Sequence, residues 1–224
     1  MLKIEDVGKC FTDGEKEKWV VNHVNFNVSK GQFISIVGRS GSGKSTLLKM
    51  IGGLLKPSAG RIEYEGMDIY SLGDKELADY RCNKIGFVFQ DFFLEDNYSV
   101  YQNVEVVLMI AGVPLADRRK MVEDALACVD MLDKKDDMAG ILSGGEKQRV
   151  SIARAIVNNP CVICADEPCG NLDYENGEIV MNLLRKQAQM GKMVILITHN
   201  NDDANRTDGK IRLQDGEIVK NELE

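Results

Sequence analysis

The sequence contains no hydrophobic run long enough to cross a membrane. A spanning helix needs roughly 18 to 20 uncharged apolar residues, whereas the most apolar run, residues 104–113, is shorter and contains Glu105. The first six residues lack the apolar core of a secretory signal. The six cysteines lie in unrelated segments, as is typical of reduced thiols. We therefore expect a cytoplasmic chain that reaches a membrane only through a partner.

An excess of basic residues is also missing. The chain has 28 Lys and Arg against 35 Asp and Glu, for a formal net charge of −7. The basic residues are scattered along the sequence, whereas nucleic-acid binders concentrate them on one face. We therefore expect no nucleic-acid partner.

What the sequence does contain is an alternation of apolar strands and helices. Strands are expected over residues 4–11, 20–28, 33–37, 61–64, 85–89, 162–165 and 194–198. From Ser143 onward, helices and strands alternate, which implies a parallel sheet covered on both faces. A hairpin is expected at Asp215-Gly216. The length of the chain, 224 residues, fits one α/β domain spanning residues 1–224.

The middle of the chain, residues 91–142, has a helical pattern and predicts a helical subdomain inserted into this domain. Ser99 and Gln102 fit a capping box that opens a helix through Ile110. A second helix is expected around residues 121–132.

The strongest motif lies between the strand at 33–37 and the next helix. It matches the phosphate-binding pattern G-x-x-x-x-G-K-[ST]. Glycines let backbone N–H groups surround phosphates, and the helix N-terminus favours negative charge. The pattern predicts ATP and Mg²⁺ as cofactors, with Lys44 on the β- and γ-phosphates and Ser45 on the metal. The motif comprises Gly38, Arg39, Ser40, Gly41, Ser42, Gly43, Lys44, Ser45 and Thr46.

Two carboxylates, Asp166 and Glu167, follow the strand at 162–165. The carboxyl edge of a parallel sheet is where ligands bind, so Asp166 is expected in the Mg²⁺ shell. Glu167 is expected to orient and deprotonate the attacking water. Such pairs often only cap loops, and it is the phosphate-binding motif that favours the catalytic interpretation.

A third motif, residues 142–149, contains Ser143, Gly144, Gly145 and Glu146. Ser143 and Glu146 fit a capping box, which by itself predicts only a well-started helix. Two glycines in a first helical turn are unfavourable, and they make sense where the backbone must approach an anion. Since the chain already has a phosphate loop, this second site is expected to contact ATP held by another subunit.

With these motifs the sequence resembles the nucleotide-binding subunit of ABC transporters, over about residues 1–220. The resemblance implies a P-loop NTPase core with a mostly parallel sheet, an N-terminal antiparallel β subdomain and the inserted helical subdomain. It also implies roles for Gln90, which senses Mg²⁺, for the loop at residues 170–173, for His199 near the γ-phosphate, and for Phe11 against adenine. Catalytic roles thus fall to Glu167, His199, Lys44 and Gln90.

The resemblance further implies an ATP-dependent head-to-tail homodimer and a separately encoded membrane-spanning permease, which would hold the chain at the inner face of the cell membrane. Within the family, the sequence resembles the subgroup that serves lipoprotein release, macrolide efflux and antimicrobial-peptide resistance, although Cys169 and Asn200 depart from its usual residues. The alternative is a soluble ABC-type ATPase, for example in cluster assembly. A P-loop kinase or GTPase gives no reason for the motif at Ser143.

The segment after Gln90 combines aromatic and turn-like polar residues. Exposed aromatic clusters favour interfaces, so Phe92, Phe93, Leu94 and Tyr98 are expected to contact the permease. The alternative is that Phe92 and Phe93 only fix the helical subdomain to the core.

Overall fold

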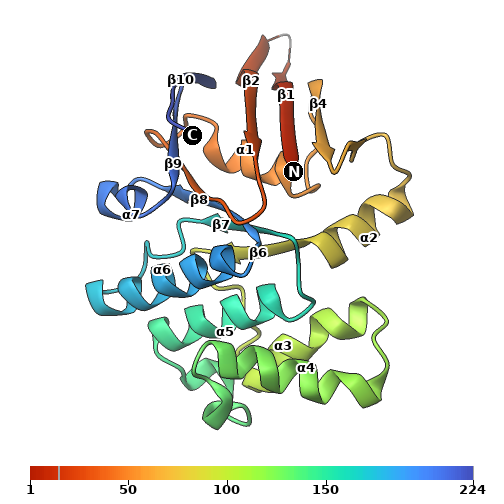
Figure 1. The fold of residues 1–224 in the computed structure, drawn as a ribbon, viewed down its shortest axis with the longest axis vertical. Coiled ribbons are helices and arrows are strands. Elements are labelled where there is room, and N and C mark those ends of the chain that lie inside the picture. Colours follow the sequence, from red (N-terminus) through yellow and green to blue (C-terminus); the bar gives the residue numbers. More distant parts are fainter. Residues whose placement is uncertain (15, 224) are drawn as a thin grey trace.

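The computed structural model describes residues 1–14 and 16–223, which form two sheets with helix α1 (Lys44–Ile51) between them (Figure 1). The first sheet is antiparallel, in the order β2-β1-β4-β5. Its strands are β1 (Leu2–Asp13), β2 (Lys16–Val28), β4 (Ala59–Tyr64) and β5 (Met67–Asp68).

The second sheet has the order β10-β9-β3-β8-β7-β6 and is parallel except for β10, which pairs antiparallel with β9. Because β3 lies beside β8, and β8 beside β7, the carboxyl ends of these three strands meet at one edge. The strands are β3 (Phe33–Val37), β6 (Ile85–Phe89), β7 (Val162–Asp166), β8 (Met193–Thr198), β9 (Gly209–Gln214) and β10 (Glu217–Asn221).

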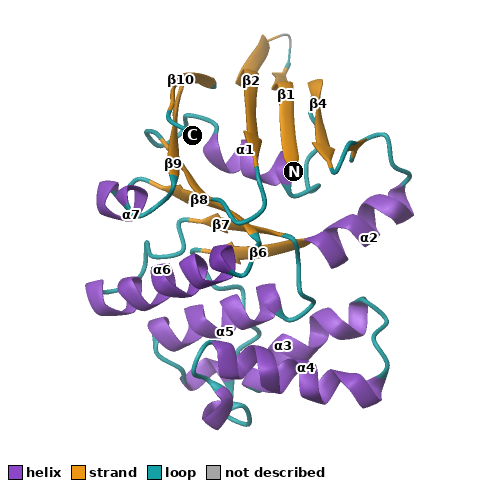
Figure 2. Ribbon diagram, viewed as in Figure 1, coloured by secondary structure: helices purple, strands orange, loops and turns teal. Residues whose placement is uncertain are grey.

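Helices cover the parallel sheet on the side away from α1, with α5 and α6 next to the sheet and α3 and α4 beyond them (Figure 2). A short helix, α7, follows β8. The bounds are α2 (Asp74–Lys84), α3 (Val100–Ile110), α4 (Leu115–Cys128), α5 (Gly144–Ile156), α6 (Tyr174–Gln189) and α7 (Asn201–Asn205), with 3₁₀ turns η1 (Leu132–Lys134) and η2 (Ala139–Ile141).

The core has two parts because successive strand residues point to opposite faces. Ile34 and Ile36 pack toward α1 and the antiparallel sheet. Phe33, Ile163 and Ala165 pack toward the helical layer. Both faces of the sheet are therefore covered, which explains why its strands are continuous apolar runs.

The predicted α/β class is confirmed, with its parallel core sheet and N-terminal antiparallel sheet. Sequence reasoning missed α2, because only Tyr80 of that helix is buried and its apolar pattern is weak. Helix α6 begins at Tyr174, because Asp173 caps it by accepting a hydrogen bond from Asn176 N. The subdomain bounds 91–142 stay a prediction. In the described part of the chain, no helix is long and apolar enough to cross a bilayer.

Candidate active site

The loop from β3 to α1 has the backbone that a phosphate cradle requires. Gly41 has φ 79° and Gly43, the N-cap of α1, has φ 99°, values that favour glycine. A Cβ at Gly43 would lie 2.3 Å from the carbonyl oxygen of Val20. The glycine spacing in this motif is therefore set both by conformation and by close packing on β2.

Lys44 and Ser42 lie inside this loop with polar groups available for a ligand. Lys44 is buried, and its Nζ donates to the carbonyl oxygens of Gly38 at 2.9 Å and Arg39 at 3.0 Å. Ser42 Oγ is buried and has no hydrogen-bond partner among the described residues. An orphaned hydroxyl, a buried ammonium and a helix N-terminus together fit a phosphate chain.

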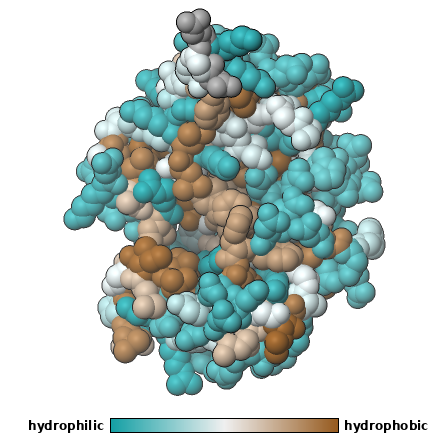
Figure 3. Space-filling model, turned by 180° about the vertical axis from the view of Figure 1, so that it is seen from behind, coloured by the Kyte–Doolittle hydropathy of each residue, from teal (hydrophilic) through white to brown (hydrophobic). Residues whose placement is uncertain are grey.

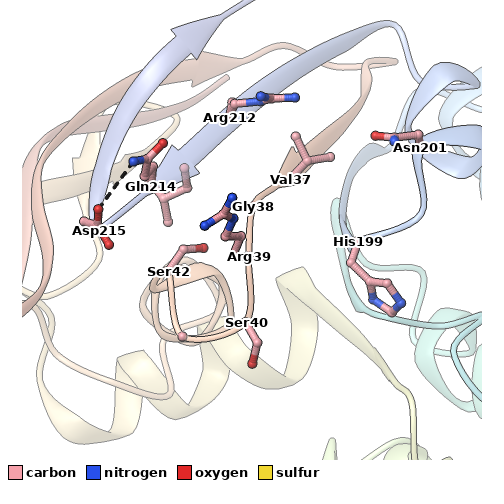
Figure 4. A pocket seen from close by; sticks show the side chains of 12 residues that line it. Val37, Gly38, Arg39, Ser40, Ser42, His199, Asn201, Arg212, Gln214 and Asp215 are labelled. Carbon is pink, nitrogen blue, oxygen red and sulfur yellow. Dashed lines mark hydrogen bonds between the residues drawn. The ribbon is translucent and has the colours of Figure 1, made fainter.

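A cavity of about 540 Å³ opens beside the loop (Figure 4). Its wall combines loop residues 38–42 with His199 and the β9–β10 hairpin. The hairpin supports the loop, because Gly216 N donates to Ser42 O at 3.2 Å. Sequence reasoning predicted the hairpin from Asp215-Gly216 but gave no reason to place it at the phosphate loop.

The metal site predicted at Ser45 and Asp166 is assembled across 121 residues of sequence. Ser45 Oγ donates to Asp166 Oδ1 at 3.1 Å, at the junction of α1 with the end of β7. Burial raises the pKa of Asp166, an effect that its hydrogen bond from Ser45 opposes. A hydroxyl and a carboxylate are hard oxygen ligands of the kind that Mg²⁺ prefers together with phosphate oxygens, so these residues fit the ion.

Glu167 and His199 are brought together at the ends of β7 and β8. His199 Nδ1 lies 3.0 Å from Glu167 Oε2. Glu167 has φ 48°, and its backbone N donates to Ile197 O at 2.9 Å, which fixes this unusual conformation. The hydrogen bond to Ile197 thus maintains a strained backbone, with the carboxylate at the sheet edge next to the exposed imidazole.

Two other predicted residues make contacts that do not test their predicted roles. Gln90 Nε2 donates to Asn171 Oδ1 at 3.0 Å, and Asn171 Nδ2 donates back to Gln90 O at 3.2 Å. No hydrogen bond described in the structure joins Gln90 to Ser45 or Asp166. Phe11 is exposed on β1, with Lys9 Nζ 5.4 Å from its ring centroid, and is not among the residues of the cavity wall. The metal role of Gln90 and the adenine role of Phe11 stay predictions.

The motif at Ser143 forms the predicted capping box at the start of α5. Ser143 N and Oγ both donate to Glu146 Oε2, at 2.8 and 2.7 Å. Hydrogen bonds from Lys134 and Ser143 lower the pKa of Glu146 to about 2. Neither residue is part of the cavity wall at the phosphate loop, so the contact with ATP in another subunit stays a prediction.

The two glycines of this motif differ in their surroundings. A Cβ at Gly145 would lie 2.0 Å from Asn176 Oδ1, whereas one at Gly144 would meet no atom closer than 3.8 Å. Packing against α6 therefore requires Gly145, a reason that sequence analysis did not foresee. Only Gly144 leaves an open backbone surface for an external anion.

The segment after Gln90 is exposed only in part, since Phe92 and Leu94 are half-buried and Leu94 packs against the helical-layer core. Phe93 is 61% exposed and Tyr98 49% exposed. Phe93 also packs edge-on against Phe89, with ring centroids 5.2 Å apart. Phe92 and Phe93 have φ 58° and 49°, a strained backbone for aromatic residues. Their contact with a permease stays a proposal.

Known proteins similar to this chain agree with the family that these motifs indicate. The family model described as ABC transporter matches residues 21–170. The chain belongs to the ABC transporter family. It is therefore an ATP-binding ATPase cassette, and the resemblance drawn from its motifs is confirmed.

Relatives of two lengths match the chain. An uncharacterized ABC transporter ATP-binding protein of Thermotoga maritima is 40% identical over 218 residues, covering 97% of this chain and 93% of that protein. The macrolide export ATP-binding/permease protein MacB of Vibrio parahaemolyticus is 41% identical over 223 residues. That match covers 100% of this chain but 34% of the relative, so the chain spans about a third of the length of the macrolide export relatives that it matches.

Solved structures give the same result. A dimeric ATP-binding cassette in a post-hydrolysis state, bound to ADP and Pi, has a TM-score of 0.90 and 38% identity, with coverage of 100% of this chain and 98% of that one. The cbiO1 protein from Clostridium perfringens, part of the ABC transporter complex cbiONQ, has a TM-score of 0.87 and 32% identity, with coverage of 99% and 87%.

Proposed function

We propose that the chain is the ATP-hydrolysing subunit of a transport or mechanotransmission system, working as a head-to-tail homodimer around two ATP molecules. One observation carries this proposal: Lys44, Ser45, Asp166 and Glu167 lie at one sheet edge, while Ser143 stands apart from the phosphate loop of its own subunit. The similar cassette solved as a dimer with ADP and Pi supports a nucleotide-bound dimer for this chain.

Each residue of the site has a defined part in hydrolysis. Lys44 binds the terminal phosphates, and Ser45 and Asp166 hold Mg²⁺. When bound, that ion neutralises charge that develops on the phosphate oxygens. Glu167 accepts a proton from the attacking water. His199 positions the Glu167 carboxylate through the contact between His199 Nδ1 and Glu167 Oε2, which are 3.0 Å apart.

The partner is a membrane-spanning permease, which holds the chain at the inner face of the cell membrane. The permease is either encoded separately or fused to the ATP-binding part, as in the macrolide export relatives. The exposed Phe93 and Tyr98 offer a docking surface for it. Similarity to macrolide export proteins supports the predicted subgroup. A soluble role in cluster assembly has no observation in its favour.

The test uses Glu167→Gln in the full chain. This variant should bind ATP and accumulate as a dimer on size exclusion with Mg²⁺, while hydrolysis falls by about 10²-fold or more, because general-base catalysis is lost. Lys44→Ala is the matched control and should lose ATP binding and the dimer together. Hydrolysis near the wild-type rate in Glu167→Gln would remove Glu167 from the mechanism.

A further inference from the structure

Asn171 and Gln90 are joined by two reciprocal hydrogen bonds at the edge of the parallel sheet. Asn171 Nδ2 donates to the main-chain carbonyl oxygen of Gln90 at 3.2 Å, and Gln90 Nε2 donates to Asn171 Oδ1 at 3.0 Å. Hydrophilic side chains are exposed over much of the molecule, as the rear view in Figure 3 shows, and such side chains are ordinarily solvated. Asn171 is exposed as well, but its amide nitrogen and its amide oxygen both bind one residue. This pairing indicates a role that acts through Gln90.

The backbone on both sides of the pair is held by the strand register and by α5. Phe89, the residue before Gln90, pairs with Asp166 in the parallel register of β6 and β7. Gln148 of α5 is fully buried, and its Nε2 donates to the carbonyl oxygens of Phe89 at 3.3 Å and Pro168 at 2.8 Å. The end of β6 is therefore tied to the segment after β7, and Gln90 starts from a fixed point beside the carboxylates.

The side chain of Gln90 also lies close against the loop that carries Asn171. A Cβ at Gly170 would lie 2.9 Å from Gln90 Nε2 and 3.0 Å from Gln90 Cδ, so a larger residue there would push the amide away. Gly170 N donates to Glu167 O at 3.0 Å, which joins this loop to the end of β7. The loop and the Gln90 amide therefore pack together next to Glu167.

The pairing decides which end of the Gln90 amide remains available. A main-chain carbonyl oxygen only accepts, so Asn171 presents Nδ2 to it and turns Oδ1 toward the Gln90 side chain. Gln90 must then present Nε2 to Asn171. Among the residues that the structure describes, no hydrogen bond uses Gln90 Oε1. A carbonyl oxygen is a ligand for a hard cation or for the water bound to it, whereas an amide nitrogen is not.

We propose that Asn171 is a positioning residue, which orients the Gln90 amide so that its carbonyl end, and not its amino end, is free for the Mg²⁺ site at Ser45 and Asp166. This inference rests on the proposed function, since it concerns the metal site of the same ATPase. Asn171 acts only by preventing the amide from turning over. Without it, the amide would lose this orientation, and ordering it again would reduce the free energy gained from Mg²⁺.

The opposite interpretation is that Asn171 holds Gln90 away from the metal and releases it when ATP binds. The two interpretations predict opposite effects of removing the Asn171 side chain. If Asn171 orients the amide, Mg²⁺ should contribute less to ATP binding in its absence. If Asn171 holds the amide away, Mg²⁺ should contribute more.

The test compares ATP affinity with and without Mg²⁺ in the full chain carrying Glu167→Gln, which removes most turnover. Isothermal titration calorimetry gives the dissociation constant of ATP in EDTA and in Mg²⁺, and we call the ratio of the two constants the magnesium gain. Adding Asn171→Ala should lower this gain about threefold to tenfold, as loss of a hydrogen bond does, and should leave the constant in EDTA unchanged. Asn171→Asp keeps an acceptor for Gln90 Nε2 and should retain part of the gain. Asn205→Ala, at another exposed asparagine whose side chain accepts one hydrogen bond, is the matched control and should keep all of it.

A double-mutant cycle shows whether Asn171 acts through Gln90. Gln90→Ala should lower the magnesium gain by itself. Adding Asn171→Ala to Gln90→Ala should change nothing further, because the amide that Asn171 orients is gone. The melting temperature of Asn171→Ala should hardly change, since the side chain is exposed.

An unchanged or larger gain in Asn171→Ala would overturn the proposal, and a larger gain would show that Asn171 holds Gln90 away from the metal. An unchanged gain in Gln90→Ala, or a full further loss when Asn171→Ala is added to it, would also overturn the proposal. Wild-type hydrolysis and ATP binding by Glu167→Gln are measured in parallel. Their failure would count against the proposed function, whereas normal hydrolysis with an unchanged gain in Asn171→Ala would count only against the role of Asn171.

Discussion

His199 Nδ1 lies 3.0 Å from Glu167 Oε2, although 32 residues of sequence separate the two side chains. They meet because parallel strands β7 and β8 are neighbours and both residues follow the strand ends. The imidazole is 67% exposed and the carboxylate 25% exposed. In the proposed mechanism, the carboxylate that orients water is thus itself positioned by a histidine whose side chain is largely exposed.

From this pair, we expect His199→Ala to lower the rate of ATP hydrolysis about 10- to 100-fold, because Glu167 loses its positioning contact. The melting temperature should hardly change, since the side chain is exposed. Steady-state hydrolysis and a thermal melt check both points. His23→Asn is the control: His23 is the other histidine, has φ 50°, which Asn tolerates, and contacts Asp6 instead. A rate unchanged in His199→Ala would exclude the positioning role.

The proposed dimer predicts complementation between two inactive variants. Ser143→Arg should keep ATP binding through its own Lys44 but hydrolyse poorly, because its partner's nucleotide meets a bulky cation. Mixed with Lys44→Ala, it forms a heterodimer with one intact composite site, so part of the hydrolysis should return. Activity of the mixture at the level of the separate variants would contradict a trans contact, provided that size exclusion shows the heterodimer.

The two glycines at the start of α5 should respond differently to alanine. Gly145→Ala places a Cβ 2.0 Å from Asn176 Oδ1 and should destabilise the fold by about 1–3 kcal/mol, as overpacking does. Gly144→Ala makes only ordinary van der Waals contacts, at 3.8 Å or more, and should keep or slightly raise stability, because alanine favours helix. Urea unfolding of both variants measures the difference. Equal stability of the two would show that Asn176 moves aside without cost.

Glu146 should give the fold a pH-dependent contribution. Its pKa is about 2 in the folded chain because of Lys134 and Ser143, against an ordinary value of 4.5. A lowered pKa means that the contribution is fully present above about pH 4.5 and is lost as the pH falls toward 2. At about pH 6, the melting temperature of the wild type should therefore exceed that of Glu146→Gln. This difference in melting temperature should become smaller at about pH 3. A gap independent of pH would mean that the Lys134 contact contributes no charge-dependent stability.

The motifs of the site could be predicted because each of them is a short local pattern, although the motifs lie far apart in the sequence. The phosphate loop needs glycines at fixed spacing, a lysine and a hydroxyl within nine residues, and these requirements produce a local pattern. Asp166 and Glu167 were likewise predicted as site residues from the apolar strand before them. Such motifs depend on backbone conformation and on helix ends, which neighbouring residues decide.

Contacts between segments that are distant in the sequence could not be predicted from such local motifs. The sequence alone determined the α/β class, the glycine-rich loop before α1, the capping boxes at Ser99 and Ser143, and the presence of some exposed aromatic side chains after Gln90. Only the tertiary structure decided that Gly145 is required by Asn176, that Gly216 supports Ser42, and that Arg154 holds Phe92 and Phe93. The physical reason is that each of these depends on the packing of separate elements, and a single sequence carries no local pattern for it.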